Sequence, residues 1–287
     1  MMDVLMGLMA AICWGGTDFL VGINARAVGV RRAVLFSQAV GLVVLTLLLL
    51  SMPLRVFDVP IAIWGLALVA AGLIVVGALA LSHAFALGKA ALIAPLVTSY
   101  GAVTALLSWI SGERLGVFTV LGLAICMLGV ILTAMNVNRQ TETSAMRLPL
   151  LFALLASLCY GCSFWLQGRY TLPVLGPDLS LWMGYAVGLT ALLIFGDRKK
   201  LLACPNLRQS GLLLAASLLN LAGFAAFAVG SGHGSLSVVT VLSTLSGGVA
   251  ALLGALLLGE RLSGVQWLGV MTVLAGALLL QVNLPGV

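Results

Sequence analysis

An acidic side chain lies inside a long apolar stretch near the start of the chain. Asp18 falls within residues 3–23, which are apolar enough to predict a membrane-spanning helix. An ionised carboxylate at the centre of a bilayer costs about 2.5–3.5 kcal/mol on the insertion scale. Asp18 is therefore expected to be protonated, to pair with a cation, or to face water in a cavity.

Trp14 precedes Asp18 by one helical turn and shares its helix face. An aromatic face beside a carboxylate suits an organic cation or the ammonium group of an amino acid. A buried carboxyl group can also exchange such a cation for a proton. Trp14 and Asp18 are therefore candidate substrate-binding residues, and Asp18 is the candidate proton-coupling group. The alternative is structural, because Asp18 is close enough to the end of the span to reach the interface or to pair with Arg26.

Other polar and aromatic side chains within apolar segments are further candidates for the wall of a cavity. Their alternative roles are hydrogen bonding within or between helices and, for the aromatic residues, packing or anchoring at the membrane interface. These candidate substrate-binding residues are Gln38, Tyr100, Tyr160, Trp165, Asn220, Ser243 and Thr244.

The remaining titratable residues and the cysteines give little support for enzymatic or metal chemistry. His83, at a glycine-flanked loop edge, is a second candidate for proton coupling. Glu113 and Glu260 stand at predicted span boundaries, where a carboxylate favours the positive end of the next helix dipole, so we assign them a structural role. Cys159 and Cys162 have C-x-x-C spacing, but no second Cys or His pair accompanies them. The sequence therefore predicts no metal, no cofactor and no enzyme.

The segments of the chain that must position these residues occur in two similar copies. Gly-Glu-Arg-Leu at 112–115 recurs at 259–262, an offset of 147 (259 − 112), and Cys13-Trp14-Gly15 corresponds to Cys159-Tyr160-Gly161 at an offset of 146 (159 − 13). The same correspondence places Tyr160 opposite Trp14 and Phe164 opposite Asp18. Duplicated apolar units are typical of membrane transporters. Because Asp18 and Phe164 occupy matching positions in the two copies, one wall of the predicted cavity is acidic and the other is aromatic.

Composition indicates an all-α integral membrane protein. Hydrophobic residues form 62% of the chain and charged residues 8%, whereas a soluble domain carries roughly 25% charged residues. The 14 Lys and Arg residues form no stripe that a phosphate backbone would follow, which excludes a nucleic-acid partner. Ten windows approach the length of a span: 3–23, 33–52, 60–82, 90–110, 115–135, 148–168, 179–196, 209–229, 235–257 and 263–282.

Five spans in each copy is an odd number, so the second copy must enter the bilayer from the opposite side. The prediction is ten transmembrane helices in two inverted five-helix repeats around a central cavity. Residues 1–137 form the first repeat, 138–147 the linker and 148–287 the second repeat. Two halves related in this way can exchange roles, which is the geometric basis of alternating access.

Basic residues predict the orientation. Loops after the odd-numbered spans hold Arg26, Arg31, Arg32, Lys89, Arg139, Arg147, Arg198, Lys199, Lys200, Arg208 and Arg261, and the remaining loops hold Arg55, Arg114 and Arg169. The positive-inside rule places the larger group in the cytoplasm, so both termini are expected outside. The first segment lacks a basic leader and is expected to remain as a helix. We expect a multi-pass protein of the cytoplasmic (inner) membrane.

The repeated motifs resemble those of the EamA branch of the drug/metabolite transporter superfamily. The resemblance covers nearly the whole chain and rests on the paired Gly-Glu-Arg-Leu blocks and on the run from Trp14 to Phe19. It implies two inverted five-helix repeats around a cavity, with spans 5 and 10 at the periphery, and export of small metabolites. In this chain Asp18 replaces the more usual Asn. The proline often found in spans 4 and 9 is also replaced, near Tyr100 and Gly247, although Pro95 is placed to bend span 4.

These observations predict a secondary active transporter that exports a small polar or zwitterionic metabolite such as an amino acid or amine. Its partners are the lipid bilayer, the substrate and a coupling proton. The sequence has no ATP-binding motif, so an ion or substrate gradient must supply the energy. A channel or a lipid flippase is the alternative. An intramembrane enzyme would need a nucleophile–base pair or metal ligands at membrane depth.

Overall fold

A computed structural model describes residues 2–51, 59–88, 90–112, 116–135, 147–195, 206–258 and 264–281. Within these ranges every regular element is helical. The first half contains α1 (Met2–Val28), α2 (Val30–Leu50), α3 (Ile61–Leu87), α4 (Ala90–Val97), α5 (Tyr100–Ile110) and α6 (Val117–Met135). The second contains α7 (Arg147–Leu166), the π-helix η1 (Gln167–Thr171), α8 (Leu172–Phe195), α10 (Leu207–His233), α11 (Leu236–Ser243), α12 (Ser246–Leu258) and α13 (Gly264–Gln281).

Five helical stretches in the described ranges are long and apolar enough to cross a membrane: Met2–Val28, Val30–Leu50, Ile61–Leu87, Leu148–Phe195 and Leu207–His233. Leu148–Phe195 holds two predicted windows, because the backbone turns at Gly176 (φ 76°) before Pro177. Positive φ favours glycine at this point. The windows at 90–110 and 235–257 are each divided between two short helices. The structure therefore supports a helical membrane protein, and the number of ten spans stays a prediction.

The two divided windows break at matching places. Between α4 and α5 the Ser99 N–H donates to Leu96 O (3.3 Å), and between α11 and α12 the Leu245 N–H donates to Leu242 O (3.1 Å). Both bonds span three residues rather than the four of an α-helix. The hydroxyl groups of Ser99 and Ser243 also donate to carbonyl oxygens three residues earlier, each at 2.7 Å. Such bonds compete with regular helical geometry, which explains a break without proline at its centre.

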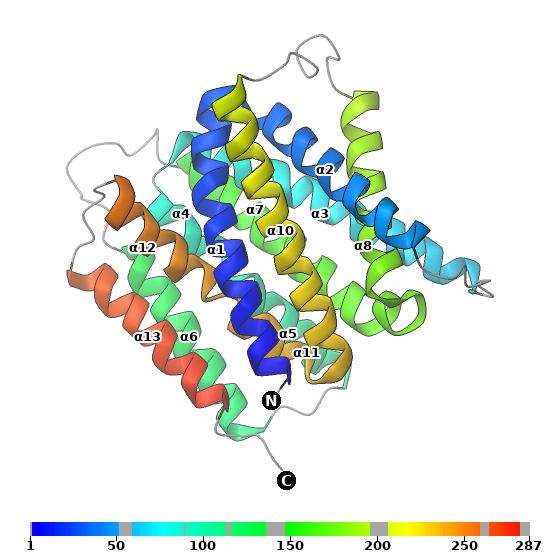
Figure 1. Cartoon of the computed structure of the whole chain (residues 1–287). Helices are drawn as coiled ribbons and strands as arrows, with labels where there is room; N and C mark the ends of the chain where they lie inside the picture. Colours follow the sequence, from blue (N-terminus) through cyan, green and yellow to red (C-terminus); the bar gives the residue numbers. More distant parts are fainter. Residues whose placement is uncertain are drawn as a thin grey trace.

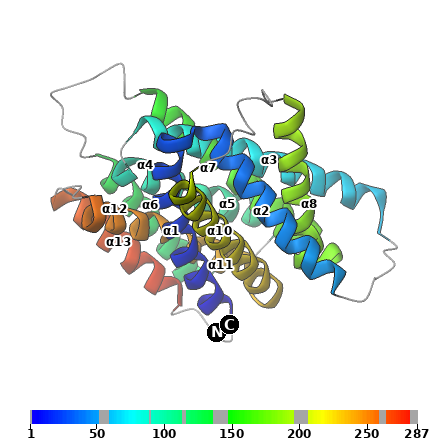
Figure 2. The same cartoon turned by 45° about the horizontal axis from the view of Figure 1, so that its top comes forward.

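Helices of the two halves pack in reciprocal pairs. The first helix of one half, α1, packs against α10, α11 and α12, and the matching α7 packs against α3, α4 and α5. Helices α6 and α13 pack against each other at one side of the molecule, and α2 and α8 lie at the opposite side (Figures 1 and 2). The start of α1 and the end of α13 lie at the same end of the bundle (Figure 1).

Two glycines make close contacts in this reciprocal packing. A Cβ atom at Gly15 would lie 2.8 Å from Ser246 O, and one at Gly161 would lie 2.9 Å from Tyr100 O. Real Cβ atoms do not approach other atoms so closely, so each site excludes a larger residue. Gly15 and Gly161 are the matching residues of the repeated Cys-aromatic-Gly motif. The duplicated motif thus brings α1 against the start of α12 and α7 against the start of α5.

Large apolar side chains cover the outside of the bundle. Leu5, Met9 and Ile12 form an exposed stripe on α1, and Leu151, Leu154 and Leu158 form one on α7. In water such surfaces are aggregation-prone, whereas in a bilayer they contact lipid tails. The polar groups of the spans are instead directed inward, toward the space that the helices enclose.

Candidate functional site

A cavity lies inside the bundle, between α1, α2, α3, α7, η1, α8 and α10, and the end of α4 and the starts of α5 and α12 also reach it. Its volume is about 110 Å³, counted as the space open to the centres of water molecules. None of the lining residues within the described ranges belongs to α6 or α13. The polar residues that line it are Thr17, Asp18, Asn24, Ser37, Gln38, Ser82, Gln167, Thr171, Ser180, Ser217, Asn220 and Ser246.

Asp18 is the single acidic residue in the described lining of this cavity. Its side chain is 8% exposed, and within the described part of the chain no residue forms a hydrogen bond or an ion pair with it. Arg26, the alternative partner considered from the sequence, donates instead to Phe85 O (3.2 Å) and Gly88 O (3.0 Å) at the end of α3. The cavity therefore holds a buried carboxyl group that the described protein leaves without a counter-charge.

An aromatic cluster lines the cavity beside Asp18. The rings of Trp14 and Phe164 stack with centroids 5.4 Å apart at 17°, and those of Tyr160 and Phe164 stack at 6.0 Å and 19°. Tyr100 meets both Trp14 and Tyr160 edge-on, with centroids 6.4 Å away in each case. Asp18 lies within electrostatic range of the hydroxyl groups of Tyr100 and Tyr160. These residues come from α1, α5 and α7, so the cluster spans both halves of the chain.

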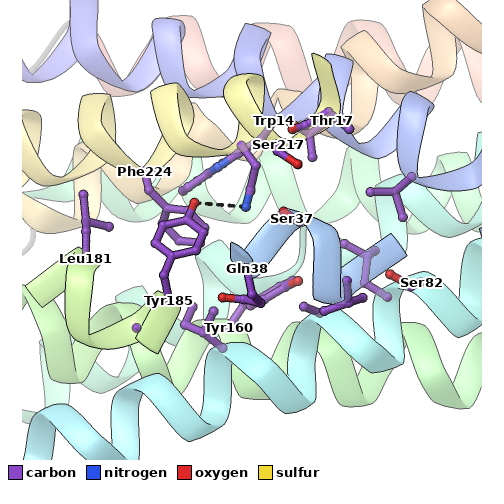
Figure 3. A pocket seen from close by; sticks show the side chains of 18 of the residues that line it. Trp14, Thr17, Ser37, Gln38, Ser82, Tyr160, Leu181, Tyr185, Ser217 and Phe224 are labelled. Carbon is purple, nitrogen blue, oxygen red and sulfur yellow. Dashed lines mark hydrogen bonds between the residues drawn. The ribbon is translucent and has the colours of Figure 1, made fainter. Parts of the chain in front are cut away.

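Gln38 and Tyr185 occupy matching places on α2 and α8. Gln38 packs against Gly188, and Tyr185 packs against Gly41, so each side chain fits over a glycine of the other helix. The Asn220 amide donates to the hydroxyl group of Tyr185 at 3.3 Å, the bond drawn as a dashed line beside Gln38 in Figure 3. Gln38 and Asn220, both predicted from the sequence, thus reach the cavity wall.

Ser243 and Thr244 lie behind the wall rather than on it. The hydroxyl group of Tyr100 bonds to Ser243 Oγ at 2.8 Å, and Ser243 Oγ donates to Thr240 O. Tyr100 is therefore the donor to Ser243. This bond links the breaks in the two divided windows, while Thr244 is buried in the second break. Ser243 holds Tyr100 in place, and Tyr100 itself faces the cavity.

Two sequence candidates lie away from the cavity. The Trp165 indole donates to Ser111 Oγ at 3.0 Å, and its ring meets Tyr170 edge-on. The His83 ring stacks on Phe152 with centroids 5.2 Å apart. Neither residue is among those that line the cavity. Their predicted roles in substrate binding and proton coupling therefore receive no support from their position.

Several lining residues were not predicted. Thr17 and Asn24 lie on the same side of α1 as the cavity, one and two helical turns from positions already identified there. Tyr185 is the counterpart of Gln38 at the offset of 147 (185 − 38). The helical spacings from Trp14 to Thr17 and from Thr17 to Asn24, together with the repeat offset, were the signals that identify these residues. Ser180 carries neither signal, and its hydroxyl group lacks a partner.

The cysteines, the possible metal ligands and the two glutamates considered from the sequence can be compared with the structure as well. Cys13, Cys159 and Cys162 are free thiols. Within the described ranges no group of three His, Cys, Asp or Glu side chains is arranged to hold a metal ion. Glu113, Glu260 and residues 138–146 of the predicted linker (138–147) lie outside the described residues, and Arg147, the last residue of that linker, begins α7.

The fold and the cavity define a multi-pass helical membrane protein with a polar interior. The EamA-like transporter family matches the chain twice, over residues 1–135 and 147–282. The chain belongs to this family, which confirms the resemblance drawn from the repeated motifs. It is accordingly a membrane transporter of the drug/metabolite type.

A solved crystal structure, titled only as that of a protein, has a similar fold. The TM-score is 0.75 at 16% sequence identity, and the alignment covers 98% of this chain and 96% of that chain. At this identity the similarity concerns the fold alone. A comparison with curated proteins gave no match.

Proposed function

We propose that the protein is a secondary active transporter that exports a small polar or zwitterionic metabolite, such as an amino acid or amine, across the cytoplasmic membrane. Asp18 binds the positively charged group of the substrate and exchanges it for a proton. Trp14, Gln38, Tyr100, Tyr160 and Asn220 form the rest of the binding surface. The observation that carries this proposal is a buried, unpaired Asp18 in an aromatic-lined cavity.

The transport cycle in this proposal is alternating access by ten spans in two inverted repeats. Reciprocal packing supports it, because α1 contacts α10, α11 and α12 in the way that α7 contacts α3, α4 and α5. In such an arrangement either half can move as the other does, which opens the cavity to each side in turn. Proton exchange at Asp18 then links the substrate to the proton gradient.

Solute counterflow in proteoliposomes tests this function. Liposomes loaded with an unlabelled amino acid or amine should take up the labelled compound saturably, and an acidic lumen should increase its accumulation. Asp18→Asn should remove the increase caused by the pH gradient. Asp178→Asn is the matched control, because Asp178 does not line the cavity. Phospholipid scrambling without saturable solute counterflow would instead indicate a flippase.

A further inference from the structure

The charge on the cavity wall is unbalanced. Among the described residues that line the cavity, Asp18 is acidic and none is Lys, Arg or His. We propose that the substrate of this cavity is an organic cation with no free carboxylate, such as an amine or a quaternary ammonium compound. This inference rests on the transport function proposed above, and it narrows that function from zwitterions to cations.

A zwitterionic substrate would need a positively charged partner for its carboxylate, and the described wall offers only neutral hydrogen-bond donors. The polar side chains that already donate to protein acceptors are Thr17, Tyr100, Gln167, Thr171, Ser217 and Asn220. The other hydroxyl and amide donors of the wall, among them those of Ser37, Gln38, Ser82 and Tyr160, are neutral as well. Burying a charge without an opposite charge is unfavourable, so the wall discriminates against a second, negative group on the substrate.

The helix starts near the cavity do not provide an alternative carboxylate site. Tyr100 and Ser246 begin α5 and α12 and line the cavity. Helix starts bind anions through free backbone N–H groups. Here the N–H groups of Gly101 and Gly247 donate to Thr98 O and Thr244 O, at 3.2 Å each. The turn that joins each pair of short helices therefore occupies donors that an anion would use.

Unpartnered atoms elsewhere on the wall leave this balance unchanged. Asn24 Oδ1 is a buried acceptor without a partner, and the indole N–H of Trp14 is a buried donor without one. The Trp14 indole packs against Gly223 on α10. The Ser180 hydroxyl group also lacks a partner, but it can donate as well as accept, so none of these atoms adds a charge and Asp18 remains the one acidic group of the described wall.

The aromatic cluster supplies the second feature that a cation requires. The stacked rings of Trp14, Phe164 and Tyr160 line the same cavity as Asp18, and Tyr100 meets the cluster edge-on. A ring face attracts an ammonium group most strongly where water is excluded. Carboxylate and ring faces together form a site for a desolvated cation, whereas a neutral solute would gain from neither.

Two matched pairs of ligands test the inference: ethanolamine against serine, and phenylethylamine against phenylalanine. Each amine differs from its amino acid by the absence of the carboxylate. Binding to the purified full-length protein is measured by isothermal titration at about pH 8, where alkylammonium groups remain charged. We expect an amine to bind at least about ten-fold more tightly than its amino acid, because the described wall has no positively charged partner for the carboxylate. Asp18→Asn should lower the affinity for the amine, and Asp178→Asn should not.

The outcomes separate this inference from the transport function. If an amino acid binds as tightly as its amine and shows counterflow, the cation inference is wrong and the transport function stands. If no member of either pair binds, the cation inference is also wrong. If, in addition, no small solute shows counterflow in proteoliposomes, the transport function fails as well.

Discussion

The two halves of the cavity share a scaffold but differ in their chemistry. Gly15 and Gly161 make equivalent close contacts, and Trp14 and Tyr160 pack against the matching glycines Gly223 and Gly77. At the next matching position the first half has Asp18, and the second half has Phe164. The contacts that hold the helices together thus agree between the halves, whereas the groups that face the cavity have diverged.

This difference separates residues that build the scaffold from residues that select a substrate. A duplicated scaffold supplies two nearly equivalent walls, and one charged position is enough to make the site asymmetric. Gln38 and Tyr185 follow the same rule, since each packs over a glycine of the opposite helix but offers a different polar group. Substitutions at shared positions should therefore affect folding, and substitutions at diverged positions should affect ligand selection.

The largest effect is expected at the shared glycines. Gly15→Ala and Gly161→Ala each introduce a methyl group within 2.9 Å of a backbone carbonyl oxygen, which forces the helices apart. Each substitution should lower the free energy of unfolding by about 2–3 kcal/mol. Thermal unfolding in detergent measures the loss. Gly72→Ala is the control, because a Cβ atom there meets nothing within 4 Å; equal melting of all three variants would contradict the packing account.

A smaller effect, confined to binding, is expected at the diverged pair. Asp18→Asn should weaken amine binding by roughly 30-fold or more, because a buried charge loses its only counter-charge. Wild-type affinity should fall as the pH falls and Asp18 takes up a proton, and Asp18→Asn should remove this dependence. Phe164→Leu removes a ring from the aromatic cluster and should weaken amine binding slightly but keep the pH dependence. Titrations from alkaline to acidic pH measure both, and a pH dependence that persists in Asp18→Asn would exclude the proposed role.

The aromatic wall is expected to contribute less. Tyr160→Leu removes a ring face beside Asp18 and should weaken amine binding about five-fold, in line with a cation–π contact of about 1 kcal/mol. Tyr160→Phe keeps the ring and should bind nearly as the wild type does. Isothermal titration of both variants separates the ring from the hydroxyl group. Equal weakening in the two variants would assign the effect to the hydroxyl group instead.

The smallest effect is expected at the link between the two helix breaks. Tyr100→Phe and Ser243→Ala each remove one side of a 2.8 Å hydrogen bond. The two substitutions should be coupled by about 0.5–1.5 kcal/mol in a double-mutant cycle of unfolding free energies. Additive losses would show that the bond does not stabilise the fold.

The sequence predicted the helical class and the duplicated organisation because both depend on features repeated over many residues. Apolar windows identified the long helices, and the offset between matched motifs paired Gly15 with Gly161, whose contacts only the structure reveals. Helix breaks were harder to predict. Those at 98–99 and 244–245 depend on hydroxyl groups that bond back to the chain, whereas proline was the expected signal.

For the candidate site, polar or aromatic residues that are unusual in an apolar segment were easy to select from the sequence. Whether such a side chain points into the cavity was harder to predict. Asp18, Trp14 and Asn220 are unusual within apolar segments, and all three line the cavity. Trp165 is just as unusual, but its indole bonds to Ser111 away from the cavity. Side-chain direction depends on how helices rotate against each other, and a single sequence does not reveal that rotation.

The central claim is that Asp18 is a reachable, substrate-binding acid inside the cavity. A hydrophobic carbodiimide that modifies protonated carboxyl groups tests it directly, with the modified residues identified by mass spectrometry of the protein in liposomes. Asp18 should be modified, and the solute that shows counterflow should protect it in proportion to its binding, while modification of Asp178 stays unchanged. Failure to modify Asp18, or modification that the transported solute does not reduce, would contradict the claim.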